Sequence, residues 1–504
     1  MLDELQRRMR IRQIPGLSMR VAQHGKLLFQ SELGVSDLVT GADLLSGHRF
    51  RLGCLTKPIV AHAVLQLARQ GRLALDESVA VLIPELAARP EFQAFTVSHL
   101  LGHTSGLARG PYCVHGYSDA ATLQRILASQ LLFEPGRHFK YSNWGYYLLG
   151  KVIERISGDT APALIAKAIF APLGMQASGF PADEVRLRGT LATGYWKGWY
   201  FGAADLAEAS EPCPHIPMLD TAGGVIATAD DYLRWLISLL DTRDHGAAQM
   251  FSHHHQVRPG YSSCLGMFME EAGGVPFYYF AASNSGYSGF MLAIPAQGLV
   301  GVALCNQAAC NDELRDMLYL ACRESMGGGG LPRFGRYDER CSILAGNRRG
   351  MVRFDGNVLL RDERHIRLHP YSRSAYFMLD GEDRRHMLRI RGRGQGDAVI
   401  TLGSQVFYER LIRLRNRPGA QAAGRDFTGM YRHAAFGKVE IIRREDQLYL
   451  SYGAAYESLL QPVGQLRYKQ GPGAFCFEDI AFQEDADSGD VTSFVLNDMV
   501  FLRA

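Results

Sequence analysis

The chain has 504 residues, of which 47% are hydrophobic and 21% charged, and its formal net charge is +3. This composition is ordinary for a globular protein of roughly two to four domains, and so weak a charge does not favour nucleic-acid binding. No run of about 18 apolar residues occurs, so no membrane span is expected. The N-terminus lacks the apolar region of a secretory signal and the nine cysteines are scattered, which favours reduced thiols in a cytoplasmic protein.

The first two thirds of the chain mix helical and strand-like segments. The spacing of apolar residues predicts, in chain order, a hairpin, two helices and a second pair of strands: residues 18–30, 55–70, 144–157 and 289–305. Gly71 and Gly158 follow the two helices as C-terminal stops. Helices and strands interleaved in this way predict one α/β or α+β domain over residues 1–330.

The pattern of apolar and polar residues changes after the four glycines that begin at Gly327, where we place a domain boundary. Short alternating runs follow, and Asp355-Gly356 and Asp380-Gly381 separate pairs of them as in β-hairpins. A polar stretch near residue 420 divides these runs into two blocks. We therefore predict two small antiparallel β-domains, over residues 331–422 and 423–504.

A candidate nucleophile stands at the predicted start of the first helix, in Cys54-Leu55-Thr56-Lys57. The partial positive charge of a helix N-terminus stabilises a thiolate there. Lys57 lies three residues on, on the same face of the helix, where it can accept the thiol proton or form an ion pair with the thiolate. The pattern alone is not specific, because a lone cysteine is usually a small buried apolar residue.

Two further segments carry polar groups suited to the same chemistry. Tyr141 and Asn143 stand just before the second helix, where a tyrosine near a lysine can shuttle a proton and an amide can both donate and accept. The alternative for this segment is a turn with an N-cap. The segment Asn284-Ser285-Gly286-Tyr287 enters an apolar strand, whose edge N–H can contribute to an oxyanion hole. Without context, it is a loop before a strand.

Taken together and in this order, the three segments resemble the motifs of the serine β-lactamase and penicillin-binding-protein superfamily: S-x-x-K, then Y-x-N or S-x-N, then K-T-G or H-x-G. The surrounding phrases are similar to the class C-type esterase and D-aminopeptidase branch over about residues 10 to 325: FRLGCLTKPIV, TVSHLLGHTSGL, PGRHFKYSNWGYYLLGKVIERISG and TAGGVIATADDYLRWL. The resemblance implies a β-lactamase-like catalytic domain. The layout resembles D-aminopeptidases, whose two extra domains are antiparallel barrels, so we expect a lipocalin-like barrel at the C-terminus.

The resemblance also implies roles for individual residues. Lys57, Tyr141 and Asn143 match the motif lysine, tyrosine and asparagine, and Gly286 matches the glycine of the third motif. The backbone N–H groups of Cys54 and Tyr287 would form the oxyanion hole.

Two positions depart from the family pattern. Cys54 stands where serine is expected, and Asn284 stands where lysine or histidine is expected. The second change removes a positive charge from the rim of the site and puts recognition of a substrate carboxylate in doubt.

A cysteine nucleophile changes the expected reaction. A thiol ionises far more readily than an alcohol, and its acyl intermediate is a thioester, which favours an amine over water. We therefore expect acyl or aminoacyl transfer through Cys54 to an amine or thiol acceptor. The alternatives are hydrolysis of an ester, amide or peptide, and an inactive binding protein on the same fold.

The expected partner is a small-molecule or peptide acyl donor, free or bound to a carrier or coenzyme A. We expect no nucleic acid, membrane, metal or organic cofactor, and the oligomeric state stays open. Cys113-x-His115 and Cys213-x-His215 lack the usual spacing of zinc ligands.

Overall fold

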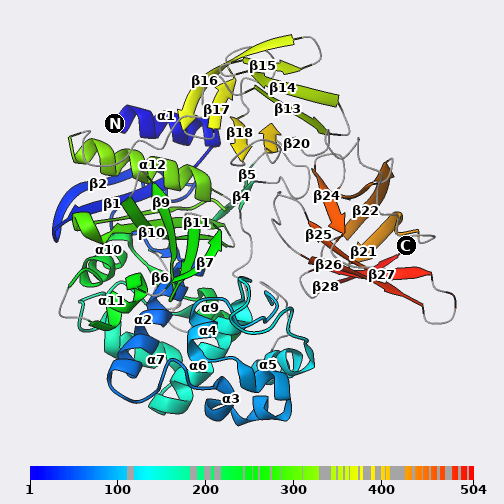
Figure 1. Cartoon of the computed structure of the whole chain (residues 1–504). Coiled ribbons are helices and arrows are strands. Elements are labelled where there is room, and N and C mark those ends of the chain that lie inside the picture. The colour runs from blue at the N-terminus through cyan, green and yellow to red at the C-terminus, as the bar shows by residue number, and fades with distance from the viewer. Residues whose placement is uncertain are drawn as a thin grey trace. The chain divides into compact units, whose positions relative to one another are not determined.

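The fold of the chain is given by a computed structural model (Figure 1). In the N-terminal part it describes residues 1–110, 118–181, 190–197, 206–208, 217–241, 245–252, 254–258, 261–272, 275–284, 286–308 and 310–327. In the C-terminal part it describes residues 342–347, 350–355, 358–361, 364–372, 375–378, 387–391, 399–402, 405–408, 426–433, 437–444, 447–452, 456–462, 466–470, 479–485, 488, 490–496 and 499–503.

An eight-stranded antiparallel sheet is the centre of the first compact unit, which comprises Met1–Lys197 and Leu206–Arg333. Its strands, in spatial order, are β2 (Lys26–Gly34), β1 (Gly16–Gln23), β12 (Leu299–Cys305), β11 (Tyr287–Ile294), β10 (Val275–Asn284), β9 (Phe268–Ala272), β8 (Tyr261–Cys264) and β7 (His254–Arg258). The predicted hairpin turns at His24 and Gly25, both with positive φ, and β11 and β12 form the predicted second pair. Both predictions are confirmed.

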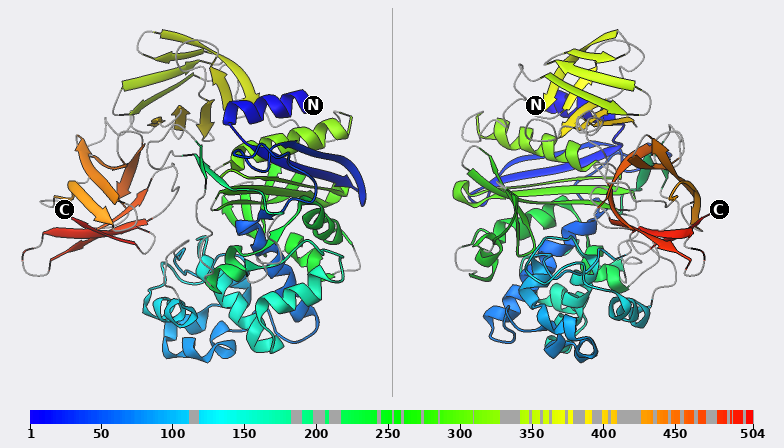
Figure 2. Two further views of the ribbon diagram at one scale, coloured as in Figure 1. Left: turned by 180° about the vertical axis from the view of Figure 1, so that it is seen from behind. Right: turned by 45° about the vertical axis from the view of Figure 1, so that its right-hand side comes forward.

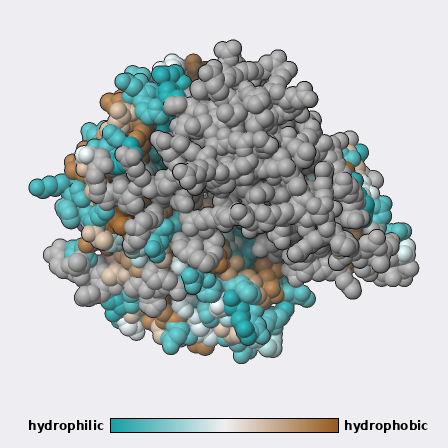
Figure 3. Space-filling model, turned by 45° about the horizontal axis from the view of Figure 1, so that its top comes forward, coloured by the Kyte–Doolittle hydropathy of each residue, from teal (hydrophilic) through white to brown (hydrophobic). Residues whose placement is uncertain are grey.

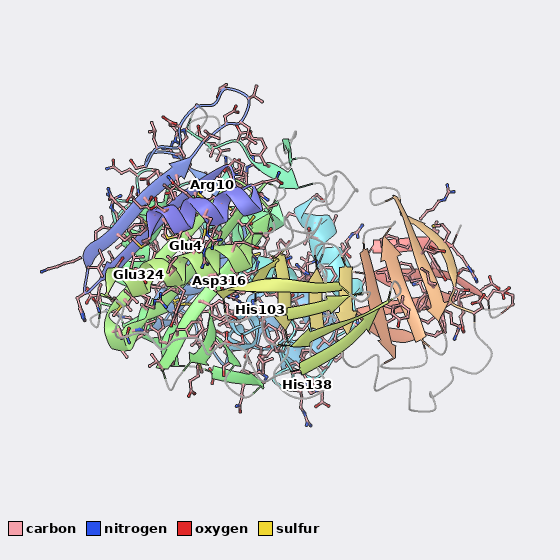
Figure 4. All side chains as sticks on the ribbon, turned by 90° about the horizontal axis from the view of Figure 1, so that it is seen from above. Glu4, Arg10, His103, His138, Asp316 and Glu324 are labelled. Atoms are coloured by element: carbon pink, nitrogen blue, oxygen red, sulfur yellow. The ribbon has the colours of Figure 1, made fainter. Side chains whose placement is uncertain are left out.

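Helices cover both faces of this sheet (Figures 1 and 2). Their bounds are α1 (Leu2–Arg12), α2 (Thr56–Arg69), α3 (Val79–Leu82), α4 (Val97–Leu101), α5 (Asp119–Ala128), α6 (Asn143–Ser157), α7 (Ala161–Ile165), α9 (Pro217–Gly223), α10 (Ala229–Ser238), α11 (His245–Ser252) and α12 (Asn311–Ser325). Gly301 of β12 faces α12, because a Cβ at this position would contact Leu318. The neighbouring residue of β12, at position 302, pairs with Arg20 of β1, and Arg20 forms an ion pair with Asp230 of α10. Because adjacent strand residues face opposite ways, α12 and α10 cover opposite faces. Figure 4 shows α1 beside α12.

The two helices that carry predicted site residues, α2 and α6, are largely buried and contact each other. Ser142 caps α6 by accepting a hydrogen bond from the N–H of Gly145 at 3.0 Å. Gly158 ends the helix with φ 78°, and Gly71 follows α2 with φ 70°, as the sequence predicts. A one-turn 3-10 helix, η1 (Gly53–Leu55), leads directly into α2 and contacts strands β10 and β11. This packing sets the start of α2 against the sheet.

The C-terminal part is antiparallel β-structure, as predicted. One closed set of strands contains β13 (Ser342–Asn347), β14 (Gly350–Asp355), β15 (Val358–Arg361), β16 (Arg364–Ser372), β17 (Ala375–Met378), β18 (Met387–Arg391), β19 (Val399–Leu402) and β20 (Gln405–Tyr408). A second contains β21 (Gly429–His433), β22 (Gly437–Arg444), β23 (Gln447–Tyr452), β24 (Tyr456–Pro462), β25 (Arg467–Gln470), β26 (Asp479–Glu484), β27 (Val491–Leu496) and β28 (Met499–Arg503). Both belong to one compact unit, Phe334–Ala504 with Gly198–Asp205, so the division at residues 422 and 423 stays a prediction.

Four short strands complete the described part of the first unit: β3 (Phe50–Arg51) pairs with β6 (Ile226–Ala227), and β4 (Tyr195–Lys197) with β5 (Leu206–Glu208). On the face drawn in Figure 3, hydrophobic spots are separated by hydrophilic ones across the described surface. Across the described segments, none of the helices is long and apolar enough to cross a membrane.

Candidate active site

Cys54 lies in η1, immediately before α2, as the sequence pattern predicts. Gly53 reaches the turn with φ 53°, a left-handed conformation that glycine adopts without strain. Cys54 forms no disulfide, and the residue is buried, with 8% of its surface exposed. η1 contacts β10 and β11, the two strands that flank the third predicted motif.

Lys57 is fully buried and directed at the other motif residues. Its Nζ donates to Asn143 Oδ1 at 2.9 Å and to the carbonyl oxygen of Ala222, and its charge interacts favourably with a thiolate at Cys54. Burial lowers the pKa of Lys57 to about 8, partly opposed by the negative charge of the Cys54 thiolate and reinforced by the positive charge of Arg109. A lysine with such a pKa exchanges protons near neutral pH, which suits a general base.

The second motif meets the first where α6 begins. Asn143 is fully buried, and its Oδ1 accepts the hydrogen bond from Lys57. Its Nδ2 has no hydrogen-bond partner among the described residues, so one donor is left for a ligand. The ring centre of Tyr141 lies 4.9 Å from Lys57 Nζ, in cation–π contact. Cys54, Lys57, Tyr141 and Asn143, predicted from two distant segments, are thus brought together.

The third motif forms the tight turn between β10 and β11. Asn284 is the last residue of β10 and pairs with Tyr287, the first of β11. Gly286 has φ 86°, and a Cβ there would lie 2.7 Å from the backbone of Gly194, so no other residue fits without a shift. The Gly286 carbonyl oxygen accepts a hydrogen bond from the N–H of Tyr195 at 3.1 Å.

The hydroxyl of Tyr287 is also engaged, since it donates to the carbonyl oxygen of Ala192 at 2.7 Å. Its hydroxyl is therefore occupied, and the role predicted for Tyr287 concerns only its backbone N–H. Ser285 and the side chain of Asn284 lie outside the described residues, as do Cys113, His115, Cys213 and His215. The pairing of the Cys54 and Tyr287 N–H groups in an oxyanion hole therefore stays a prediction.

His103, one of the labelled residues of Figure 4, is a site residue that the sequence analysis did not single out, although it lies in the phrase TVSHLLGHTSGL. Its Nδ1 accepts the N–H of Ser142 at 3.1 Å, and its ring centre lies 4.5 Å from that of Tyr141. Burial, with a smaller contribution from the positive charge of Lys57, holds the pKa of His103 well below its usual range. A neutral ring that accepts at Nδ1 carries its proton on Nε2.

The backbone of His103 is unusual for a residue with a side chain, because its φ is 57°. Its carbonyl oxygen accepts the N–H of Lys140 at 2.9 Å, so His103 holds the segment 140–142 through both backbone and ring. Its Nε2 has no partner among the described residues. His103 therefore orients the loop that carries Tyr141.

Arg109 is the second residue that the sequence analysis missed. Its guanidinium carbon lies 5.9 Å from the centre of the Tyr141 ring, the same ring that Lys57 contacts. No motif spacing indicates this position, because Arg109 reaches the site through tertiary contacts of its backbone with the start of α6.

Comparisons with known proteins identify the family of the chain. A family model described as Beta-lactamase matches residues 3–321, more than half of the chain. Esterase EstB of Burkholderia gladioli is 35% identical over 195 residues, which are 35% of this chain and 50% of the esterase. Penicillin-binding protein 4 of Amycolatopsis lactamdurans is 27% identical over 339 residues, which are 60% of this chain and 84% of that protein. The chain thus spans half the length of the esterase it matches.

Solved structures share the fold at low identity. The octameric penicillin-binding protein homologue from Pyrococcus abyssi aligns with a TM-score of 0.60 at 20% identity, over 81% of this chain and 99% of that one. EstCE1, described as a hydrolase with promiscuous acyltransferase activity, aligns with a TM-score of 0.53 at 22% identity, over 65% of this chain and 99% of that one. The chain belongs to the beta-lactamase family.

Proposed function

We propose that the protein is an acyltransferase that passes an acyl or aminoacyl group through a thioester on Cys54 to an amine or thiol acceptor. The observation that carries the proposal is the electrostatic interaction of Cys54 with Lys57, a fully buried lysine with a pKa of about 8. A buried base next to a thiol generates the thiolate, which is the nucleophilic form. Asn143 holds Lys57 in this position.

The reaction follows from these roles. Lys57 takes the proton of Cys54, and the thiolate attacks the carbonyl carbon of the donor. The bond to the leaving group breaks, and the leaving group departs with a proton returned by Lys57. The acceptor then attacks the thioester carbon and gives its proton to Lys57, and the Cys54 sulfur leaves as thiolate and takes that proton back from Lys57. The Asn143 Nδ2 donor, which lacks a partner among the described residues, is available to a polar group of the substrate.

The second candidate is hydrolysis of an ester or amide, in which water takes the place of the acceptor. It is favoured by the identity to Esterase EstB, which is 35% over 195 residues. The fold accommodates both outcomes, since EstCE1 is described as a hydrolase with promiscuous acyltransferase activity. We favour transfer because a thioester reacts with amines in preference to water more than an oxygen ester does.

The test is intact mass spectrometry of the protein after incubation with acyl donors, with and without an added amine. The donors are N-acetylcysteamine thioesters, and D- and L-aminoacyl esters and amides. We expect an acyl adduct on the wild type that is absent from Cys54→Ala, and faster turnover when amine is present. The matched control is Cys264→Ala, because burial raises the pKa of the Cys264 thiol to about 12 and that thiol should not react.

Other outcomes separate the alternatives. An adduct that turns over at the same rate with and without amine would indicate the hydrolase. An adduct that persists in Cys54→Ala would contradict the nucleophile. If no donor gives an adduct or turnover, the inactive binding protein becomes the better interpretation.

A further inference from the structure

Tyr146 presents a second aromatic ring to Lys57, the buried base of the proposed reaction. Lys57 Nζ lies over this ring at 5.5 Å from its centre, and over the ring of Tyr141 at 4.9 Å. The imidazole of His103 lies against both rings, with its centre 5.1 Å from that of Tyr146 and 4.5 Å from that of Tyr141. The ammonium group and the three rings therefore form one contiguous cluster.

The ring of Tyr146 is held in place by its hydroxyl. Tyr146 is fully buried, and its hydroxyl donates to the carbonyl oxygen of Leu101, the last residue of α4, at 3.1 Å. The same carbonyl oxygen accepts the N–H of Gly266 at 3.3 Å. Burial raises the pKa of Tyr146, so the hydroxyl keeps its proton at any working pH. Tyr146 therefore acts on Lys57 through an uncharged ring and not as an acid or base.

An aromatic ring matters to Lys57 because this lysine must change its charge during the reaction. Burial favours the neutral amine and lowers the pKa of Lys57 to about 8. The face of an aromatic ring attracts a cation, so a ring over Nζ favours the protonated form. Tyr146 thus opposes part of the effect of burial, at the stage when Lys57 holds the proton of Cys54.

Other titratable or charged groups also interact with Lys57 in the described part of the chain: the Cys54 thiol, the Arg109 guanidinium, the His103 imidazole and the Tyr141 phenol. A thiolate at Cys54 raises the pKa of Lys57, whereas the positive charge of Arg109 lowers it. His103 is neutral, because burial holds its pKa well below the usual range. Among the rings, that of Tyr146 is the one whose replacement leaves the segment 140–142 untouched.

We propose that Tyr146 is a positioning residue of the reaction, whose ring, together with that of Tyr141, holds the ammonium form of Lys57 after Lys57 has taken the proton of Cys54. The inference rests on the role of Lys57 as the base of the proposed acyl transfer. Tyr146 needs no contact with the substrate, since it acts through Lys57.

The test removes the ring and the hydroxyl separately. Tyr146→Leu and Tyr146→Met both lack the ring, and the second fills more of the vacated space, whereas Tyr146→Phe lacks only the hydroxyl. The matched control is Tyr147→Leu, because Tyr147 is the next residue of α6 and is 2% exposed. Its ring lies beside Lys151 instead, with Nζ 5.6 Å from the ring centre. All variants are compared by kcat/KM for acylation of Cys54 by one N-acetylcysteamine thioester from pH 6 to pH 9.5.

The pH profile is the readout that a merely structural role would not move. Wild-type acylation should rise with pH near 8, as Lys57 loses its proton. In Tyr146→Leu and Tyr146→Met the ammonium form loses a ring, so the rise should move lower by about 0.5 to 1 pH unit. Tyr146→Phe should keep the wild-type profile. Tyr147→Leu should lose stability but also keep that profile.

A double-mutant cycle of Lys57→Met and Tyr146→Leu measures the same contact without an acyl donor. Urea unfolding of the wild type, the two single variants and the double variant gives the coupling between the two side chains. At pH 6.5, where Lys57 is charged, the coupling should be about 3- to 30-fold in the unfolding equilibrium constant. It should decrease as the pH rises through 8, because the neutral amine is not attracted to the ring.

Two results would overturn the inference while leaving acyl transfer standing. One is a profile of the ringless variants that stays in place or moves to higher pH, as expected if water enters the vacated space. The other is a coupling that is absent at pH 6.5 or does not change with pH. If no donor acylates the wild type, the proposed function fails, and the cycle still decides whether Tyr146 holds the ammonium form of Lys57.

Discussion

The candidate active site and the interior of the β21–β28 sheet are both buried, but they are built from opposite kinds of side chain. The second is a cluster of apolar and aromatic residues: Phe427, Tyr431, Ile441, Leu448, Leu450, Leu460, Phe482, Val491, Phe494 and Phe501. Its tyrosine is satisfied internally, since Tyr431 donates to the carbonyl oxygen of Phe427 at 2.9 Å. The rings pack closely, with Phe494 and Phe501 centred 4.7 Å apart.

The site, in contrast, buries a lysine, an imidazole and an amide. Asn143 Nδ2 and His103 Nε2 have no partner among the described residues, and Lys57 is buried at a cost to its charged form. Buried polar atoms without partners are rare in folded proteins, because each costs about 1–3 kcal/mol. The aromatic cluster therefore contributes to stability, whereas the candidate site leaves buried donors without partners, as expected of a site that binds a substrate.

The largest expected effect comes from replacing the buried base. Lys57→Met should slow acylation by about 10³-fold, within the usual contribution of a general base. Stability should change by less than about 2 kcal/mol, because the variant removes a charge whose burial costs about 3 kcal/mol at neutral pH but leaves the Asn143 acceptor without its donor. The measurements are acylation rate by mass spectrometry and urea unfolding.

The pH dependence sharpens this prediction. The pKa of Lys57 is about 8 in the folded protein and 10.5 in an ordinary lysine, so the unfolded chain binds more protons between these values. The free energy of unfolding of the wild type should therefore increase relative to that of Lys57→Met as the pH rises from 7 to 9. Near-normal acylation by Lys57→Met, or a loss of more than about 4 kcal/mol in its free energy of unfolding, would show that Lys57 has a structural role. The site would then not differ in purpose from the aromatic cluster.

The next effect is on the aromatic cluster. Phe494 is fully buried between the rings of Tyr431, Phe482 and Phe501, so Phe494→Ala should lower the free energy of unfolding by about 3–5 kcal/mol. Hydrogen exchange of strands β26 to β28 measures it. The control is Leu502→Ala, because Leu502 is 61% exposed and its loss should cost less than about 0.5 kcal/mol. A cost below about 1 kcal/mol for Phe494→Ala would show that the interior is loosely packed.

The smallest effect concerns His103. Because its pKa is held well below 6.5 in the folded protein, the unfolded chain binds more protons below pH 6.5, and the wild type should lose up to about 1.4 kcal/mol of stability per pH unit on acidification. His103→Asn keeps an acceptor and tolerates the left-handed backbone but does not titrate. Urea unfolding at pH 7, 6 and 5 should show a shallower loss for this variant. Parallel curves would mean that His103 is not held neutral.

Local sequence determined the elements and the identities of the reactive groups. The hairpin at His24-Gly25, the helix that stops at Gly158 and the Cys54–Lys57 spacing depend on backbone preferences and neighbours within a few residues, and each is present in the structure. The motif residues Lys57, Tyr141 and Asn143 could be named because their types and order follow a family pattern. The sequence alone also shows that Cys54 stands where the family pattern has serine, and that Asn284 stands where the pattern has a basic residue.

Which polar groups meet depends on the tertiary structure. Lys57 and Asn143 are 86 residues apart, and their hydrogen bond exists because α2 and α6 pack together. His103 and Arg109 reach Tyr141 through contacts of their own with the start of α6, which no spacing in the sequence encodes. The lowered pKa of Lys57 follows from burial, and burial is a property of the whole packed domain. Helix and turn preferences act over a few residues, whereas the environment of a site is set by segments that the fold brings together from far apart in the chain.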